Sequence, residues 1–237
     1  MAGNTYLVLD IETIVDEAVW TPPPEDPDVF PPQYAHRIIA VGVLWLNPDY
    51  GFRRMGIMGE TGDERRILSD LSSFVDKHRP VLVTYNGRVF DLPVILLRAL
   101  KYAVSIPWYF TGRGYRYRFS EEGHYDLMDQ LSDYGAARAS SLDVVCRLIG
   151  LPGKLDMDGG DVGQLFIKGE VDRIETYCLT DVIQTAFLFL RHRLVTGAID
   201  TERYSSACTK LLDAVHDDGR FESILNGINR PALLLEE

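Results

Sequence analysis

Short and nearly continuous apolar runs dominate the first third of the chain. Residues 5–11, 38–46 and 81–84 each have the pattern of a strand that is buried on both faces. Residues 51–58 follow the second run across Asn47-Pro48-Asp49, which is a turn sequence, so these two segments are expected to pair as a hairpin. The pattern therefore predicts four strands in this part of the chain.

Farther along, apolar positions recur every three or four residues, which is the spacing of one face of a helix. Helices are predicted over residues 63–78, 91–103, 141–149, 171–195, 201–217 and 221–227. Because the strands come early and the helices late, we expect an α/β fold in which helices cover a mixed sheet. No linker divides the chain, so residues 1–237 are expected to form one domain.

One long segment shows neither pattern. Residues 21–32, TPPPEDPDVFPP, are expected to lack regular structure, because proline removes a backbone donor and fixes φ. A loop of this length is often functional, and the alternative is a solvated surface connection. The pattern leaves both interpretations open.

Composition limits the classes of function. No run approaches the ~18 apolar residues of a membrane helix, and the N-terminus lacks the basic start of a signal peptide. The three cysteines form no zinc spacing, so Cys146 and Cys178 are expected to be small core residues of a cytoplasmic protein. The net charge of −11 argues against tight non-specific binding to duplexes. It leaves a nucleic-acid enzyme possible, because bound cations would change the local field.

The first segment with candidate chemistry is Asp10-Ile11-Glu12, at the end of the first apolar run. Side chains alternate along a strand, so both carboxylates point to the same side. Two carboxylates this close repel each other, and a divalent cation removes the repulsion. Oxygen ligands suit Mg²⁺ or Mn²⁺. An exposed strand end is the alternative interpretation of this pair.

The second segment is Asn86-Gly87-Arg88-Val89-Phe90-Asp91, which directly follows a predicted strand. Gly87 permits a sharp turn or a close approach to a substrate. Arg88 could contact a phosphate, and Phe90 could stack on a terminal base. Asp91 begins the next predicted helix, where capping is the alternative to metal binding.

The third segment carries Tyr177 and Asp181, four residues apart on one face of the longest predicted helix. An acid beside an apolar stripe is costly unless it is paired or binds a metal. The alternative is a Tyr–Asp pair that borders solvent. Each of the three segments is ambiguous alone, and their order along one chain is more informative.

In this order the segments resemble the DEDD superfamily of 3′-to-5′ exonucleases. The defining acids match Asp10, Glu12, Asp91 and Asp181. Tyr177 resembles the tyrosine subclass, since the histidine subclass would have histidine at the position of Thr176. Residues 5–210 are similar to bacterial stand-alone exonucleases related to the proofreading domain of family-B DNA polymerases, including the stretches His124–Leu127, Ser141–Asp143 and Gly150–Lys154.

This resemblance implies a ribonuclease-H-like fold, a five-stranded mixed sheet flanked by helices, with the fifth strand near residues 123–126. It implies two divalent ions, with Asp10 bridging them, Glu12 and Asp181 at the first ion and Asp91 at the second. Tyr177 would orient the attacking water. The implied substrate is single-stranded nucleic acid with a free 3′ end, DNA in preference to RNA, cleaved to nucleoside 5′-monophosphates. Contacts to substrate are expected from Asn86, Gly87, Arg88 and Phe90.

Other functions remain as alternatives. A non-catalytic nucleic-acid-binding module could use the same fold, and a small-oligonucleotide phosphodiesterase could use the same four acids. Glycoside hydrolysis by paired carboxylates leaves Tyr177 and Asp181 unexplained. Residues 98–119 mix arginines with aromatic side chains, which suits single strands, and a β-rich segment with a solvated edge is the alternative. Structural roles are expected for His124, Asp126, Asp129 and Asp143.

Overall fold

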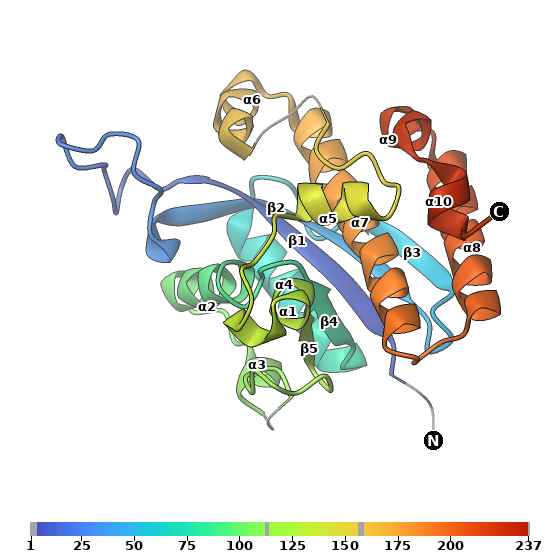
Figure 1. Cartoon of the computed structure of the whole chain (residues 1–237). Helices are drawn as coiled ribbons and strands as arrows, with labels where there is room; N and C mark the ends of the chain where they lie inside the picture. Colours follow the sequence, from blue (N-terminus) through green and yellow to red (C-terminus); the bar gives the residue numbers. More distant parts are fainter. Residues whose placement is uncertain (1–3, 112–113, 156–158, 237) are drawn as a thin grey trace.

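In the computed structural model, five strands form one mixed sheet in the order β3-β2-β1-β4-β5 (Figure 1). The strands are β1 (Tyr6–Val15), β2 (His36–Leu46), β3 (Phe52–Ile57), β4 (Val81–Thr84) and β5 (His124–Asp126). β2 pairs antiparallel with β1 and β3, whereas β4 pairs parallel with β1 and β5. The structure describes residues 4–111, 114–155 and 159–236. The predicted hairpin and the fifth strand are both confirmed.

β1 is longer than its apolar run. The sequence predicts a strand over residues 5–11 that ends at the acidic pair, but the strand continues to Val15. A bulge between Glu12 and Thr13 shifts the register against β2, and pairing resumes beyond it. The predicted strand end is therefore wrong, because pairing with β2 continues where the apolar pattern stops. Both acids lie inside the strand.

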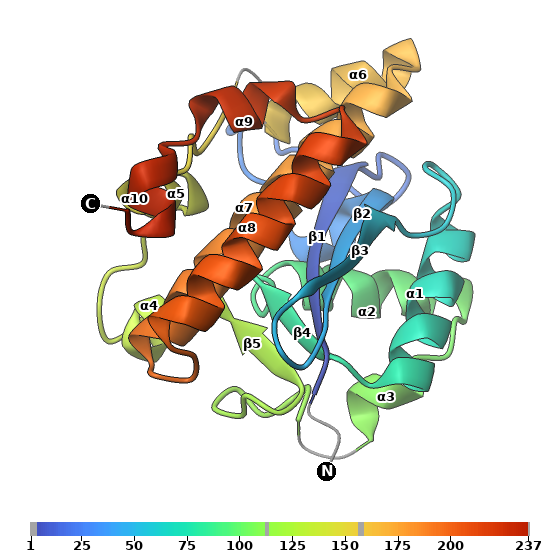
Figure 2. The same ribbon diagram turned by 90° about the vertical axis from the view of Figure 1, so that its right-hand side faces the viewer.

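Helices cover both faces of the sheet (Figures 1 and 2). On one face, α1 (Glu64–His78), α2 (Asp91–Tyr102) and α3 (Pro107–Phe110) share a core with Leu7, Leu9 and Leu82 of the strands. On the other face, α7 (Val171–Val195) and α8 (Thr201–Asp218) share a core with Val8 and Val83. The alternation of strand side chains therefore divides the apolar residues between two layers of helices.

The remaining helices are short. They are α4 (Leu127–Leu131), α5 (Leu142–Leu148), α6 (Val162–Lys168), α9 (Glu222–Gly227) and α10 (Arg230–Leu234), with 3-10 turns η1 (Gln33–Ala35), η2 (Asp133–Gly135) and η3 (Gly159–Asp161). Every helix expected from the periodicity is present, with ends that agree to within one residue. α3, α4, α6 and α10 were not predicted, because a helix of one or two turns is too short to show a period.

α7 approaches the sheet closely at Gly42 of β2. A Cβ at Gly42 would lie 2.8 Å from Sγ of Cys178 and 3.1 Å from Cγ2 of Val182. Gly42 is the register partner of Asp10 in β1. Glycine has no side chain, so α7 can lie against the strand pair at the level of the acids.

A buried ion-pair network joins elements on the α1/α2 face. Arg98 of α2 is 2% exposed, and its guanidinium donates to Glu64 and to Asp16, each at 2.7 Å. Glu64 also accepts from the N–H of Ile38 at 2.7 Å. Arg98 therefore links α1, α2, β2 and the chain that leaves β1. Removing one partner of such a pair would leave an uncompensated buried charge.

Residues 98–119 do not form one nucleic-acid-binding stretch. Arg98, Trp108 and Tyr115 are buried, so the expectation that these side chains contact single-stranded nucleic acid is wrong. The β-rich alternative is also wrong, because this stretch contains the end of α2 and all of α3. Phe110, Tyr117 and Phe119 are exposed, and Arg113 lies outside the described residues. Some aromatic side chains of this segment pack in the core and others lie on the surface. Amino-acid composition alone does not distinguish the two groups.

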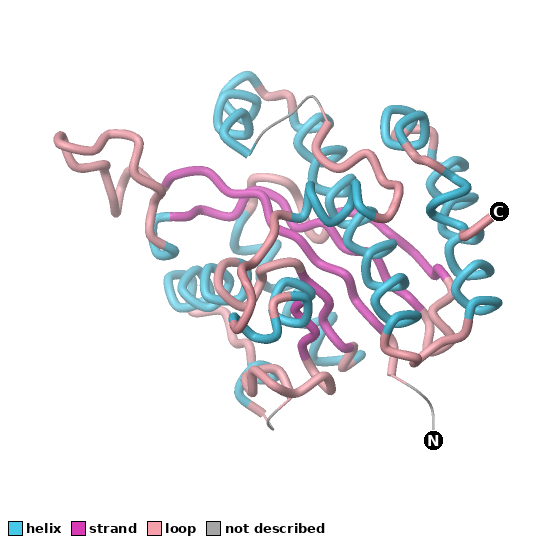
Figure 3. The backbone as a smooth tube through the Cα atoms, in the orientation of Figure 1, coloured by secondary structure: helices cyan, strands magenta, loops and turns pink. Residues whose placement is uncertain are grey.

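Residues 16–32 form no helix or strand and extend from the body of the molecule, as predicted for 21–32 (Figures 1 and 3). The segment returns to the sheet through η1 and enters β2 at His36. None of the helices in the described ranges combines the length and the apolar character that crossing a bilayer requires.

Candidate active site

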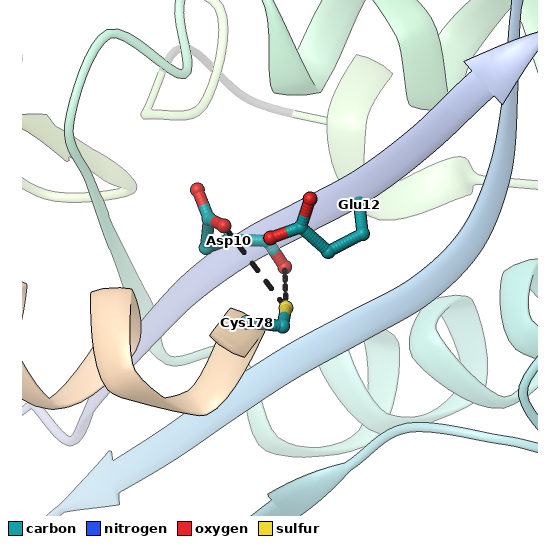
Figure 4. A group of neighbouring side chains, drawn as sticks. All are labelled: Asp10, Glu12 and Cys178. Atoms are coloured by element: carbon teal, nitrogen blue, oxygen red, sulfur yellow. Dashed lines mark hydrogen bonds between the residues drawn. The ribbon is translucent and has the colours of Figure 1, made fainter. Parts of the chain in front are cut away.

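Asp10 and Glu12 of β1 point toward α7. They share a strand face with Val8, which belongs to the core beneath α7. Figure 4 shows both side chains beside Cys178 of α7. One oxygen of each carboxylate and Sγ of Cys178 all lie within 4.8 Å of one another. Glu12 is 6% exposed, so the pair is not an exposed strand end.

The parallel pairing of β4 with β1 carries the turn after β4 to the acidic pair. Asn86 is the left-handed residue of this turn, with φ 66°. Gly87 has another role, because a Cβ there would lie 2.5 Å from Oγ1 of Thr84. Gly87 therefore allows the turn to pack closely on β4, and the sharp turn that the sequence assigned to it belongs to Asn86.

Asp91 is the first residue of α2, after Phe90 in the N-cap position. Its Oδ1 is buried without a hydrogen-bond partner among the described residues, although backbone hydrogen bonds from Asp91 itself and from Ile11 lower the pKa of the carboxyl. Asp91 is 3% exposed and close enough to raise the pKa of both Asp10 and Glu12. Capping alone would leave this buried oxygen unsatisfied, so it is not a full account of the acid.

α7 supplies Tyr177 and Asp181, one helical turn apart on one face. Asp181 raises the pKa of Glu12 and of Asp10, so its carboxylate faces the same group. Tyr177 is half-buried and packs against a small core that includes Ile39 of β2. Three separate parts of the chain thus place four carboxylates together, with a tyrosine on the same helix face as the fourth.

Burial raises the pKa of all four acids, and repulsion from other members of the group adds to it for Asp10 and Glu12. Burial is the largest cause for Asp10, followed by Asp91, Glu12 and Asp181, and it lifts the pKa well above the usual range. The pKa of Glu12 is also well above its usual range, through burial and then Asp181 and Asp91. Burial raises the pKa of Asp91 to about 7 and that of Asp181 to about 6, the latter opposed by Lys154.

This donor set fits hard divalent cations. The unpaired Oδ1 of Asp91 carries a cost of ~1–3 kcal/mol that a cation would remove. Cations would also neutralise the repulsion that raises the pKa of Asp10 and Glu12. Mg²⁺ and Mn²⁺ prefer carboxylate oxygens, so the residues that would hold them are Asp10, Glu12, Asp91 and Asp181.

A cavity of about 610 Å³ lies beside Glu12. Phe90, Phe30 and His36 form an aromatic wall on it, from the turn before α2, the long loop and the start of β2. The ring centroids of His36 and Phe90 are 4.8 Å apart, and those of Phe30 are 5.3 Å from His36 and 6.0 Å from Phe90. Phe30 is 71% exposed, so the loop contributes an open ring to the wall.

Hydrogen bonds hold the His36 ring in place. Nε2 lies 3.0 Å from the carbonyl oxygen of Pro31, and Nδ1 lies 2.9 Å from Oγ1 of Thr13. A carbonyl only accepts, so Nε2 carries the proton and Nδ1 of the neutral ring accepts from Thr13. Burial lowers the pKa of His36, which favours this neutral form.

The side chain of Arg88 is mostly buried and pairs with an acid of the protein itself. Its side chain is 14% exposed, and Nε lies 3.6 Å from Oδ2 of Asp129 in α4. Asp126 holds the same turn, since it accepts from the N–H groups of Asn86 at 3.0 Å and Arg88 at 2.7 Å. The structural roles expected for Asp126 and Asp129 are confirmed, and the phosphate contact expected for Arg88 stays a prediction.

A protein family described as "Predicted 3'-5' exonuclease related to the exonuclease domain of PolB" matches residues 28–226. The chain belongs to this family. The exonuclease class expected from the sequence is thereby confirmed. The matched range contains Asp91, Tyr177 and Asp181 but begins after Asp10 and Glu12. Tertiary structure is what joins those two acids to the others.

Two archaeal polymerases resemble this exonuclease family member over part of their length. A DNA polymerase of Archaeoglobus fulgidus is 26% identical over 132 residues, which are 53% of this chain and 17% of the polymerase. The family B DNA polymerase of Pyrobaculum calidifontis superposes with a TM-score of 0.57 and 16% identity, covering 95% of this chain and 30% of that chain. The chain therefore spans less than a third of either protein. The structural likeness confirms the ribonuclease-H-like fold.

The sequence reasoning missed two neighbours of the acids in this family member. Cys178 is buried, as expected, but its Sγ lies 3.6 Å from the carbonyl oxygen of Asp10. Helical spacing held that signal, because Cys178 precedes Asp181 by three residues. Phe30 gave no signal, because its loop has no pattern that relates it to Phe90.

Proposed function

We propose that this protein is a tyrosine-subclass DEDD exonuclease that removes nucleotides from the 3′ end of single-stranded nucleic acid as nucleoside 5′-monophosphates. Two divalent cations, Mg²⁺ or Mn²⁺, would be held by Asp10, Glu12, Asp91 and Asp181. The observation that carries the proposal is the convergence of these acids with raised pKa values. Such a group is unfavourable as bare anions and gains from bound cations.

Each side chain of the group would have a separate role in metal binding or in orienting the water. Bound cations would lower the pKa of a water and stabilise charge on the phosphate oxygens. Asp10 and Glu12 each interact with the other acids of the group, and the resemblance to the DEDD superfamily would give Asp10 the position shared by both ions. By the same resemblance, Glu12 and Asp181 would hold the first ion and Asp91 the second. Tyr177 shares a helix face with Asp181 and would orient the attacking water by a hydrogen bond.

The cavity beside Glu12 is suited to the terminal base. Aromatic rings stack on bases whatever their sequence, and a base can enter such a wall only when it is unpaired. Asn86 and Gly87 shape the turn that presents Phe90 to this cavity, and Arg88 is the cation of the same turn. We propose DNA in preference to RNA because both similar proteins are DNA polymerases.

The test is a gel assay on 5′-labelled single strands of DNA and RNA with Mn²⁺ or Mg²⁺. Wild type should shorten the strands stepwise from the 3′ end, and a chelator should stop it. Asp10→Ala should lose several orders of magnitude in rate. Asp76→Asn is the matched control, because Asp76 is an exposed acid of α1 paired with Arg79, and it should cleave like wild type.

Intact strands with wild type under both metals would overturn the proposal, as would equal rates for wild type and Asp10→Ala. Cleavage of dinucleotides but not of longer strands would instead favour the small-oligonucleotide phosphodiesterase. The ratio of the DNA and RNA rates decides the sugar preference.

A further inference from the structure

Cys178 adds a sulfur ligand to the acidic group. Sγ lies 3.6 Å from the carbonyl oxygen of Asp10 and 4.0 Å from its Oδ2 (Figure 4). One oxygen each of Asp10 and Glu12 completes a set of three ligand atoms within 4.8 Å of one another. The catalytic mechanism proposed above uses both carboxylates but gives no role to the thiol of Cys178.

Hard and soft cations would use this set differently. Mg²⁺ takes oxygen ligands, whereas Zn²⁺ and Cd²⁺ also bind thiolate strongly. Zinc binds sulfur at ~2.3 Å and carboxylate oxygen at ~2.0–2.2 Å, so two ligands of one tetrahedral ion are about 3.6 Å apart. The set of Asp10, Glu12 and Cys178 is thus within side-chain rotation of a zinc site.

Two further features favour a cation next to this thiol. The backbone N–H of Gly42 donates to Sγ at 3.2 Å and supports negative charge there, whereas burial and then Glu12 and Asp10 raise the pKa of the thiol, so a cation must displace the thiol proton as it binds. The buried, unpaired Oδ1 of Asp91 belongs to the same group of acids and is nine-tenths or more buried. The close packing of α7 on Gly42 also holds Sγ in position, so binding needs no movement of the helix.

We propose that Asp10, Glu12 and Cys178 form a site for a thiophilic divalent cation, Zn²⁺ or Cd²⁺, that competes with the catalytic cations and inhibits cleavage. The inhibition rests on the proposed function, whereas the binding does not. On binding, the S–H bond breaks, its proton leaves to solvent and the sulfur donates an electron pair to the ion. The soft ion excludes Mg²⁺ or Mn²⁺ because it occupies the same two carboxylates.

The test is a titration of the metal-free full-length protein with Cd²⁺, followed by the ultraviolet charge-transfer absorbance of a thiolate–cadmium bond. Wild type should give a saturable band that excess Mn²⁺ suppresses. Cys178→Ser should lose the band. Cys208→Ser should keep it, because Cys208 is a buried cysteine of α8 that neighbours Tyr204.

Calorimetry with Zn²⁺ gives a second readout. The affinity of Cys178→Ser for Zn²⁺ should fall by more than ~10-fold, and the Zn²⁺ concentration that halves Mn²⁺-dependent cleavage should rise by a similar factor. Its affinity for Mn²⁺ should change much less, because Mn²⁺ uses the oxygens. Circular dichroism verifies folding, and Cys178→Ala replaces the serine variant if that variant is misfolded.

A wild-type protein without the band overturns the proposal, as does a band of equal strength in Cys178→Ser or Cys178→Ala. Failure of the proposed function has a different signature: the cadmium band persists and depends on Cys178, but no metal supports cleavage. Cleavage that Mn²⁺ supports and Zn²⁺ leaves unaffected would refute the inhibitory role alone.

Discussion

Replacing Asp91 by asparagine should stabilise the metal-free protein at pH 8, although it removes a residue proposed for the active site. Burial raises the pKa of Asp91 from its ordinary 3.8 to about 7. A carboxyl with a higher pKa in the folded state stabilises the fold while it is protonated. That contribution is fully present below pH 3.8 and is lost as the pH rises through about 7.

The magnitude follows from the difference between the two pKa values. At 1.36 kcal/mol per pKa unit, ionising Asp91 costs about 4 kcal/mol of folding free energy at pH 8. Interior relaxation makes this an upper bound. At pH 5 the unfolded group is already mostly ionised, so about 1–2 kcal/mol of the cost is present there. Asparagine resembles the protonated carboxyl and does not ionise, so Asp91→Asn should escape most of this cost.

The assay is urea unfolding at pH 5 and pH 8 in the presence of a chelator. Asp91→Asn should gain about 2–4 kcal/mol over wild type at pH 8 and less at pH 5. Asp16→Asn is a control of opposite sign: burial alone would raise the pKa of Asp16, but hydrogen bonds from Lys101 and Arg98 lower it to about 2. It should lose about 2 kcal/mol at pH 8. If Asp91→Asn is destabilised at pH 8, Asp91 is a structural acid and the reasoning fails.

Three further predictions concern residues on other elements. Tyr177→Phe removes one orienting hydrogen bond and should lower kcat by about 10- to 100-fold with little change in KM, as measured by steady-state kinetics; an unchanged kcat would remove tyrosine from the mechanism. Phe30→Ala should weaken binding of a single strand by ~1–3 kcal/mol in fluorescence anisotropy, whereas Val29→Ala in the same loop should not, and equal affinities would rule out the aromatic wall. Gly42→Ala should lower the melting temperature through a contact of 2.8 Å, at a cost of ~1–3 kcal/mol. Gly56→Ala in β3, where a Cβ meets nothing within 4 Å, should be neutral, and an equal loss in both variants would contradict the packing argument.

Local pattern determined most of the secondary structure. Six helices were predictable because burial of one face imposes a period on the sequence, and the hairpin was predictable from an apolar run followed by a turn sequence. The end of β1 was not, because backbone pairing with β2 continues past the apolar residues. Arg98 was expected in a segment that contacts nucleic acid. The composition of residues 98–119 does not show that Glu64 and Asp16 pair with Arg98 in the interior. The short helices depend on contacts made by the rest of the fold.

The sequence by itself also determined two halves of the site. Strand alternation places Asp10 and Glu12 on one side, and helical spacing places Tyr177 and Asp181 on one face. Spacing along a strand or helix carries no information about the distance between two elements. That distance was decided by tertiary structure.

Two packing features brought the halves together. The parallel pairing of β4 with β1 delivers Asp91, and the bare backbone of Gly42 lets α7 lie against β1 and β2. The packing at Gly42 also brings Cys178 to Asp10, the path of the long loop places Phe30 beside Phe90, and burial raises the carboxyl pKa values. These properties come from burial and from contacts between distant segments, so only the folded chain contains them.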